Sequence, residues 1–341
     1  MNIIDLRSDT VTKPTPDMYK AIAEAELGDD VFGDDPVTIR LEELAAEKVG
    51  KEAAMLVPSG TMGNLTAVKV HTRAPQEIIV EEKSHVYNYE VGGMSAVAGV
   101  LPRPVKSNKG HIASETIQAA IRDAANVHYA PTSLLCVENT HNFHGGVYLT
   151  PTQMSEMYAT AKARGLNVHL DGARIFNAAV AQGINVREMT RYCDSVQFCL
   201  SKGLASPIGS LVAGPRGFIT EARRVRKMLG GGMRQAGIVA ACGVVSLTRM
   251  VDRLAEDHAN CRWMAERLVE CSGVTLDMAT VQTNLLFFRT AQPAAELITL
   301  WRSGGVLATP VGAQEIRFAF HKDVSRANTE RVWEVVRSTF E

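Results

Sequence analysis

The stretch "VHLDGARIF" (Val168 to Phe176) places an apolar segment of strand type directly before a carboxylate, Asp171. A glycine follows that carboxylate, and Arg174 stands three residues beyond it. A carboxylate at a buried sheet position is costly in free energy unless a cation meets it. We therefore expect Asp171 to face a cationic group, and the identity of that group decides what the site does.

The segment before this stretch carries the signals of a helix. Thr150 is a candidate N-cap, Pro151 stands at the first helical position, and Gln153 completes a capping box. Gly165 marks the expected end of the helix, so the strand that follows ends at Asp171. Apolar residues recur on one face of this helix, at Met154, Met157, Tyr158 and Ala161.

From about residue 50 to residue 215, β-rich runs alternate with helical patterns, which predicts an α/β fold with a mostly parallel sheet sandwiched by helices. Ligands of such sheets bind beyond the carboxyl ends of the strands. The candidate strands span residues 77–81, 133–139, 167–171, 195–201 and 209–214. The first four are followed or ended by polar groups, namely His85, then Asn139 with His141, then Asp171, then Ser201 with Lys202.

A chain of 341 residues favours two domains. After Gly230 to Gly232, long helical sequence with a break leads away from the sheet region. The remainder predicts a small C-terminal α+β domain, with strands in 283–290, 305–311 and 315–321 and a helix from about Ser325. We place the division between residues 1–248 and residues 249–341.

The composition is that of a globular protein, with 46% hydrophobic and 21% charged residues. Lys and Arg number 36 against 37 for Asp and Glu, so no basic field predicts a nucleic-acid or membrane partner. Charges at Asp5, Arg7 and Asp9 do not fit a signal peptide, and no apolar run reaches about 18 residues. Six cysteines without a CxxC pair predict free thiols. We expect a cytoplasmic protein with a small-molecule ligand.

Two further motifs bear chemistry. In "VQFCLSKGL", Lys202 follows an apolar strand, and it is either a solvated loop residue or a desolvated amine that can attack a carbonyl. In "VPSGTMGNL", Ser59, Gly60 and Thr61 precede a helical pattern and can cradle a phosphate with backbone amides. The common nucleotide loops are absent. With Asp171 as partner of a ring nitrogen and Lys202 as partner of an aldehyde, the set fits pyridoxal phosphate (PLP).

Seven motifs now identify a family resemblance. The chain resembles the low-specificity L-threonine aldolases and L-allo-threonine aldolases, which are fold-type I PLP-dependent enzymes of the aromatic amino acid β-eliminating lyase group. The resemblance extends in order from the N-terminus to about residue 245 and more weakly beyond. The motifs are "DLRSDTVTKP" (5–14), "GDDVFGDDP" (28–36), "PSGTMGN" (58–64), "ENTHN" (138–142), "LDGARIFNA" (170–178), "CLSKGL" (199–204) and "GGGMRQAG" (230–237).

The resemblance implies roles for the matching positions. Lys202 corresponds to the lysine of the Schiff base, Asp171 to the acid at the ring nitrogen, and His85 to the histidine stacked on the ring. Arg234 corresponds to an arginine that a neighbouring subunit lends to the phosphate site, which implies a homotetramer of two dimers with shared active sites. The full set of expected cofactor contacts is Ser59, Gly60, Thr61, His85, Asp171, Arg174, Lys202 and Arg234.

The substrate carboxylate is expected to bind Ser8, Arg174 and Arg317, again by resemblance. Arg317 has independent support in "EIRFAFH", where strand alternation separates it from Ile316 and Phe318. A guanidinium also suits a carboxylate, because it donates two parallel hydrogen bonds.

The activity implied is that of a carbon–carbon lyase. It is the retro-aldol cleavage of L-threonine, L-allo-threonine and related β-hydroxy-α-amino acids to glycine and an aldehyde. The group that takes the hydroxyl proton is left open between His85, His128 and a water held between them. No metal is expected, because the HxxH of His141 and His144 has no partnering cluster in the sequence.

Three alternatives remain. Another PLP reaction, β-elimination or amino transfer, would use the same Asp171, Lys202 and Arg317. A PLP-fold protein that binds and oligomerises without turnover is a second. A nicotinamide dehydrogenase is disfavoured, because the glycine fingerprint is missing.

Overall fold

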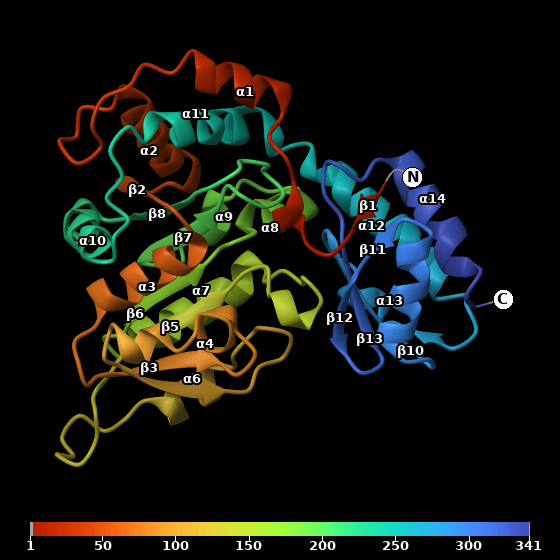
Figure 1. The fold of residues 1–341 in the computed structure, drawn as a ribbon. Helices are drawn as coiled ribbons and strands as arrows, with labels where there is room; N and C mark the ends of the chain where they lie inside the picture. Colours follow the sequence, from red (N-terminus) through yellow and green to blue (C-terminus); the bar gives the residue numbers. More distant parts are fainter. Residues whose placement is uncertain (1–2, 341) are drawn as a thin grey trace.

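The structure is a computed structural model that describes residues 3–340, and it contains one seven-stranded sheet, one four-stranded sheet and one two-stranded sheet (Figure 1). The large sheet has the order β2-β8-β7-β6-β5-β3-β4. In it, β8 is antiparallel to both neighbours and all other pairs are parallel, which confirms the mostly parallel sheet. The strands are β2 (Ala53–Val57), β3 (Glu77–Glu81), β4 (Leu101–Val105), β5 (Thr132–Glu138), β6 (Asn167–Asp171), β7 (Ser195–Cys199) and β8 (Ser210–Gly214).

Alternate residues of each strand face the two sides of this sheet. Ile79 lies in one apolar core, whereas its neighbours Ile78 and Val80 lie in another. Both faces therefore require covering helices. The first core contains residues of α1 (Pro16–Ala23), α2 (Pro36–Val49), α6 (Ser114–Ala120), α7 (Pro151–Lys162), α8 (Ile175–Gln182), α9 (Arg187–Thr190) and α11 (Gly237–Val245). The other face is covered by α3 (Gly60–His71), α4 (His85–Asn88), α5 (Gly93–Ala96) and α10 (Arg216–Met228).

Helix α7 begins as predicted. The Thr150 side chain accepts a hydrogen bond from the Gln153 amide, and the Gln153 side chain accepts one from the Thr150 amide, so the capping box is present. The helix ends at Lys162, and Gly165 adopts a positive φ of 73° just beyond it. The following strand ends at Asp171, where the spacing placed it.

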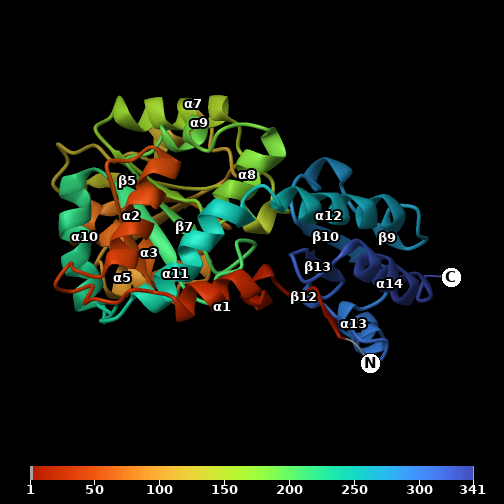
Figure 2. The same cartoon turned by 90° about the horizontal axis from the view of Figure 1, so that it is seen from above.

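The chain leaves the large sheet through a helical region that is broken at residues 251–253. Helix α11 passes through a π-helical turn (Ser246–Met250) into α12 (Leu254–Leu268), which lies against the C-terminal domain (Figure 2). The boundary predicted after residue 248 falls within this π-helical turn. The C-terminal sheet has the antiparallel order β12-β13-β10-β9. Its elements are β9 (Val274–Thr275), β10 (Leu285–Thr290), β12 (Thr309–Gly312) and β13 (Glu315–Ala319), with α13 (Ala294–Ser303) and α14 (Arg326–Arg337).

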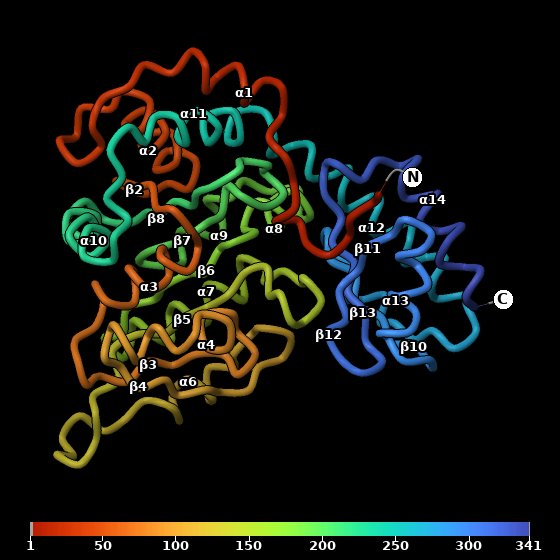
Figure 3. Tube along the Cα trace, viewed as in Figure 1, coloured from red at the N-terminus to blue at the C-terminus, as the bar shows by residue number. Residues whose placement is uncertain are grey.

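The N-terminal segment joins the two domains. Strand β1 (Ile4–Asp5) pairs in parallel with β11 (Val306–Leu307), and Leu6 is buried in the core of the C-terminal domain. The chain then returns to the large domain, where α1 packs beside α11 (Figure 3). The predicted division does not include this pairing. A short 3-10 helix (Asp9–Val11) consequently lies where the domains meet. No helix among residues 3–340 combines the length and the apolar character needed to cross a bilayer.

Candidate active site

The carboxyl ends of three adjacent parallel strands meet at one level of the large sheet. The register pairs Asp171 with Glu138 on one side and with Gln197 on the other. Lys202 follows β7 closely, so it comes to the same edge. Asp171 and Lys202 line one cavity of about 290 Å³, here called the first cavity. The other predicted residues that line it are Ser59, Gly60, Thr61 and His85.

The first turn of α3 forms one wall of the first cavity. Ser59 caps the helix, since its Oγ accepts from the Met62 amide at 3.2 Å and its carbonyl accepts from the Gly63 amide at 3.1 Å. The amides of Gly60 and Thr61 are left without an intrahelical acceptor. A Cβ atom on Gly60 would lie 2.9 Å from Cys199 Sγ, so this position has no room for a side chain. Gly60 thus packs against β7, and the turn offers an anion the two free amides.

Asp171 is 3% exposed, and its carboxylate is held by neighbouring donors. Asn64 Nδ2 donates to Oδ2 at 2.9 Å, and the Ala173 amide donates to Oδ1 at 3.1 Å. Gln197 adds a donor to Oδ1 at 3.1 Å when its amide nitrogen faces the carboxylate. Sequence reasoning identified neither Asn64 nor Gln197, because only the fold brings them to β6.

His85 is held from two sides at the edge of the first cavity. Its Nδ1 lies 2.9 Å from Glu90 Oε1, and its amide donates to Glu138 Oε2 at 2.6 Å. Burial opposes the charged imidazole, but the hydrogen bond to Glu90 and the nearby charge of Asp171 outweigh it and raise the pKa of His85. Burial likewise raises the pKa of Glu90. The pair therefore binds a proton more readily than either group would in water.

A second cavity, of about 450 Å³, lies next to the first and shares Thr10, His85 and Lys202 with it. Its lining combines both domains with the N-terminal segment. The predicted carboxylate-binding residues Ser8, Arg174 and Arg317 all line this second cavity.

Arg317 carries an unmatched charge in the second cavity. Its Nη2 donates to the Arg7 carbonyl at 2.7 Å, its Nε is buried without a partner, and it forms no ion pair with any residue between 3 and 340. Burial, with the neighbouring charge of Arg174, lowers the pKa of Arg317. An anionic ligand would relieve this imbalance.

Arg174, unlike Arg317, has its charge paired within the chain. Its Nε and Nη2 each donate to Asp9 at 2.7 Å, and only Nη1 faces another group, Asn142 Oδ1 at 3.4 Å. Its charge is already matched by a buried carboxylate. Asp9 lies next to Ser8, whose Oγ accepts from the Thr10 amide at 3.2 Å. The sequence pattern did not identify Asp9 as the partner of Arg174.

An aromatic pair borders the second cavity. Tyr89 and Phe143 stack with ring centroids 4.4 Å apart, and Tyr89 also stacks on His85 at 5.8 Å. These rings offer an apolar wall to a bound molecule. Neither residue was singled out from the sequence.

His128 and Arg234 are not brought to these cavities by their own chain. His128 lies on an exposed loop (121–131) that contributes to neither cavity. The role of His128 as a base therefore stays a prediction, because a sequence motif does not show which subunit its loop serves. Arg234 is 54% exposed and pairs with Asp29 at 3.1 Å.

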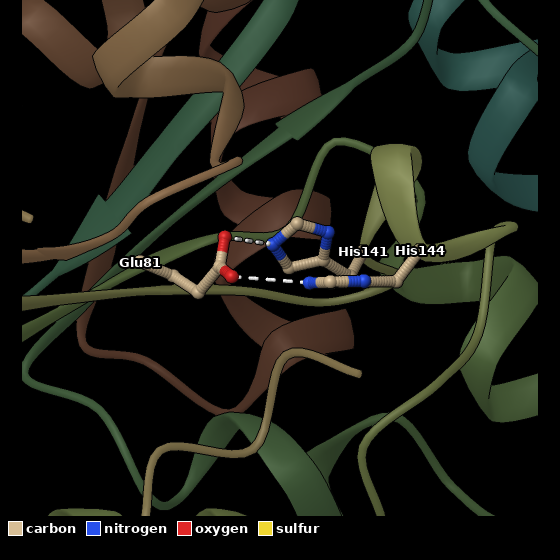
Figure 4. Close-up of side chains that lie close together, drawn as sticks. All are labelled: Glu81, His141 and His144. Atoms are coloured by element: carbon tan, nitrogen blue, oxygen red, sulfur yellow. Dashed lines mark hydrogen bonds and ion pairs between the residues drawn. The ribbon is translucent and has the colours of Figure 1, made fainter. Parts of the chain in front are cut away.

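The HxxH pair acquires a partner that the sequence did not reveal. His141 and His144 each direct Nε2 to a carboxylate oxygen of Glu81, at 2.9 and 3.0 Å (Figure 4). A histidine that binds a metal donates its other ring N–H to an acceptor. His141 Nδ1, however, is buried and has no hydrogen-bond partner among the described residues. The geometry fits a hydrogen-bonded cluster in which both histidines donate to Glu81.

Comparison with known sequences identifies close relatives. A sequence model of the beta-eliminating lyase family matches residues 5–291. The chain is 44% identical over 336 residues to a probable low-specificity L-threonine aldolase 2 of Arabidopsis thaliana, covering 96% of this chain and 95% of the relative. It is 43% identical over 334 residues to a low specificity L-threonine aldolase of Escherichia coli K12, covering 97% of each.

Solved structures share the fold. A threonine aldolase of Leishmania major superposes with a TM-score of 0.85 at 18% identity, covering 99% of each chain. A putative L-allo-threonine aldolase of Listeria monocytogenes gives 0.80 at 19% identity, covering 98% of this chain and 95% of the other. These similarities confirm fold type I, and the cofactor of the protein is PLP. The chain belongs to the beta-eliminating lyase family and, within it, to the low-specificity L-threonine aldolases.

Proposed function

We propose that the protein cleaves L-threonine, L-allo-threonine and related β-hydroxy-α-amino acids to glycine and an aldehyde, as a PLP-dependent carbon–carbon lyase. The observation that carries this proposal is that the two cavities adjoin and share His85 and Lys202. An amino acid whose carboxylate binds Arg317 in the second cavity has its amino group directed to Lys202. The same molecule then reaches the first cavity, where Asp171 lies.

The residues of the first cavity fit PLP. The amides of Gly60 and Thr61 suit its phosphate, the carboxylate of Asp171 suits a protonated ring nitrogen, and Lys202 suits its aldehyde. When bound, PLP supplies an electron sink for the cleavage of a bond at the substrate Cα.

Arg317 orients the substrate. Its guanidinium holds the carboxylate in the second cavity, which Tyr89 and Phe143 also line. Fixing the carboxylate and the amino group restricts rotation of the substrate, so that one Cα bond is placed for cleavage. Ser8 and Arg174 also line this cavity and are the other two expected contacts of the carboxylate. Asp9 holds Arg174 through Nε and Nη2, so that Nη1 keeps only a long contact of 3.4 Å to Asn142 Oδ1.

His85 is the residue best placed to accept the hydroxyl proton. Glu90 occupies its Nδ1, which leaves Nε2 for the substrate, and the raised pKa of His85 makes its neutral ring a stronger base. A water held between His85 and His128 would serve equally. His128 would act only from a neighbouring subunit.

Product analysis tests the activity. Purified protein with PLP should convert threonine to glycine and acetaldehyde, and Lys202→Ala should lose both this turnover and the visible Schiff-base absorption. Formation of a 2-oxo acid would instead support amino transfer or β-elimination, which use the same lysine. A Lys202→Ala variant that keeps full turnover contradicts the proposal.

We also propose a cytoplasmic homotetramer with shared active sites. The exposure of His128 and Arg234, which line neither cavity of their own chain, supports a role for both at a neighbouring subunit. Five buried cysteines are free thiols (Cys136, Cys193, Cys199, Cys242 and Cys261), which supports a reducing compartment. The molecular mass in solution tests the assembly.

A further inference from the structure

A chain of buried hydrogen bonds extends from the first cavity along the inner side of α3. It begins at His85 and Glu90, passes through Asn64 to Asp171, and continues through His169. It ends at Ser195 of β7 and His71 at the end of α3. Asn64 is 2% exposed and His169 is fully buried, so water does not compete for these bonds.

Asn64 is the branch point of this chain. Its Nδ2 donates to Glu90 Oε1 at 2.8 Å and to Asp171 Oδ2 at 2.9 Å. One amide group thus supplies both of its protons to two different carboxylates. Oxygen atoms of these carboxylates and a nitrogen of His85 all lie within 4.8 Å of one another. Two carboxylates this close repel each other, and a shared donor offsets that repulsion.

The orientation of Asn64 determines the tautomer of His169. Since Nδ2 faces the carboxylates, Oδ1 must accept, and it lies 3.1 Å from His169 Nε2. His169 Nε2 therefore carries a proton. Its Nδ1, 2.9 Å from Ser195 Oγ, is then the acceptor of the serine hydroxyl. Ser195 Oγ in turn accepts from His71 Nε2 at 2.7 Å.

Each hydrogen bond in this chain consequently has one direction. Burial lowers the pKa of His169 to about 3 and that of His71 to about 4, so both rings are neutral near pH 7. A neutral His169 with its proton on Nε2 prevents the Asn64 amide from turning over. If the amide turned, its oxygen would face two carboxylates.

We propose that Asn64 is a positioning residue, locked in one amide orientation by His169, that holds Asp171 for the cofactor ring and Glu90 for His85 at the same time. The inference rests on the proposed function only for the role of Asp171 and His85 in turnover. The residue assignments apply to any PLP reaction at this site. Asn64 connects the group expected at the ring nitrogen with the group expected at the substrate hydroxyl.

Cofactor binding tests the proposal without turnover. Titration of the apo protein with PLP should show binding about tenfold to a hundredfold weaker for His169→Leu and for Asn64→Ala, because a buried donor is lost. His169→Gln, which keeps a donor for Asn64, should restore most of the affinity. Thr66→Val is the matched control, since Thr66 is buried on the same helix and its hydroxyl has no hydrogen-bond partner among residues 3–340. Wild-type affinity in His169→Leu, or a loss as large in Thr66→Val, overturns the proposal.

The tautomer provides a second measurement on the unmodified protein, which decides the matter should a variant fail to fold. Nitrogen NMR of 15N-histidine-labelled apo protein, with His169→Gln for assignment, should show His169 neutral and protonated on Nε2 from about pH 5 to 8. A proton on Nδ1, or titration of this ring in that range, refutes the assigned chain. Wild-type protein that binds PLP but releases no aldehyde from threonine would refute the proposed function and leave this test standing.

Discussion

Asp9 and Arg174 form a buried, two-pronged ion pair in which Nε and Nη2 of the arginine each donate to a carboxylate oxygen at 2.7 Å. Asn284 of the C-terminal domain donates to the same carboxylate at 3.2 Å. The pair therefore connects the N-terminal segment, the large domain and the small domain beside the second cavity. Both Arg174 and Arg317 line the second cavity, but only the charge of Arg317 is left without an ion-pair partner among the described residues.

Removal of the carboxylate should destabilise the protein strongly. Asp9→Ala leaves the buried Arg174 without its partner, and we expect the free energy of unfolding to fall by about 3–5 kcal/mol. Asp17→Ala is the control, because its ion pair with Arg249 is exposed and should contribute less than about 1 kcal/mol. Urea denaturation of both variants measures the difference. An equal decrease in the free energy of unfolding of both variants would show that the buried ion pair contributes no more stability than the exposed one.

The same pair predicts a pH dependence of stability. Burial alone would raise the pKa of Asp9, but the charge and hydrogen bonds of Arg174 outweigh it and hold that pKa well below the ordinary value. A carboxyl with a lowered pKa in the folded state contributes stability that is present above its unfolded pKa and lost as the pH falls below it. Between about pH 5 and pH 3, wild type should therefore lose stability more steeply than Asp9→Asn. If the free energy of unfolding of wild type and of Asp9→Asn falls with pH at the same slope, Asp9 is not the source of the pH dependence.

Local signals in the sequence predicted the central strands and the edge where the site forms. The capping box at Thr150 marked the start of α7 and Gly165 its end. The strand that follows was therefore expected to end at Asp171, where β6 does end. Two strands of the large sheet were missed for physical reasons. Strand β4, "LPRPV", contains two prolines, which only an edge strand tolerates, and β2, "AAMLV", has the composition of a buried helix.

The contacts that hold the site could not be predicted in the same way, because they join distant parts of the chain. Asp9 and Arg174 are 165 residues apart, and Asn64 and Asp171 are 107 apart. Nothing in a local pattern selects one buried acid over another as partner. The position of His128 relative to an active site depends on how the subunits assemble, and a single chain does not show that.

Truncation of the unpaired arginine should affect substrate binding alone. Arg317→Ala is expected to raise the KM for threonine roughly tenfold to a hundredfold, because charge-assisted hydrogen bonds to the carboxylate are lost. The visible absorption of the bound cofactor should not change, since Arg317 does not line the first cavity. Arg289→Ala, an exposed position on the same small sheet, is the control. An unchanged KM would remove Arg317 from the site.

The partner of His85 should control the pH profile. Glu90→Gln removes the carboxylate that raises the pKa of His85, so the pKa of His85 should fall. If His85 accepts the hydroxyl proton, the rising limb of kcat/KM should then move to lower pH. Steady-state rates across the pH range measure this shift. A Glu90→Gln limb that coincides with that of wild type would assign the base to another group.

Sharing of active sites between subunits can be tested by mixing inactive variants. Lys202→Ala damages the first cavity of its own chain, whereas Arg234→Ala should damage the cavity of a neighbour. Co-expression of the two should form hybrids in which one site is intact, and random pairing predicts about a quarter of the wild-type sites. Lys202→Ala mixed with Asp171→Ala is the matched control, because both residues line the same cavity and no intact site can form. If the first mixture regains no more activity than the control, Arg234 serves its own chain or none.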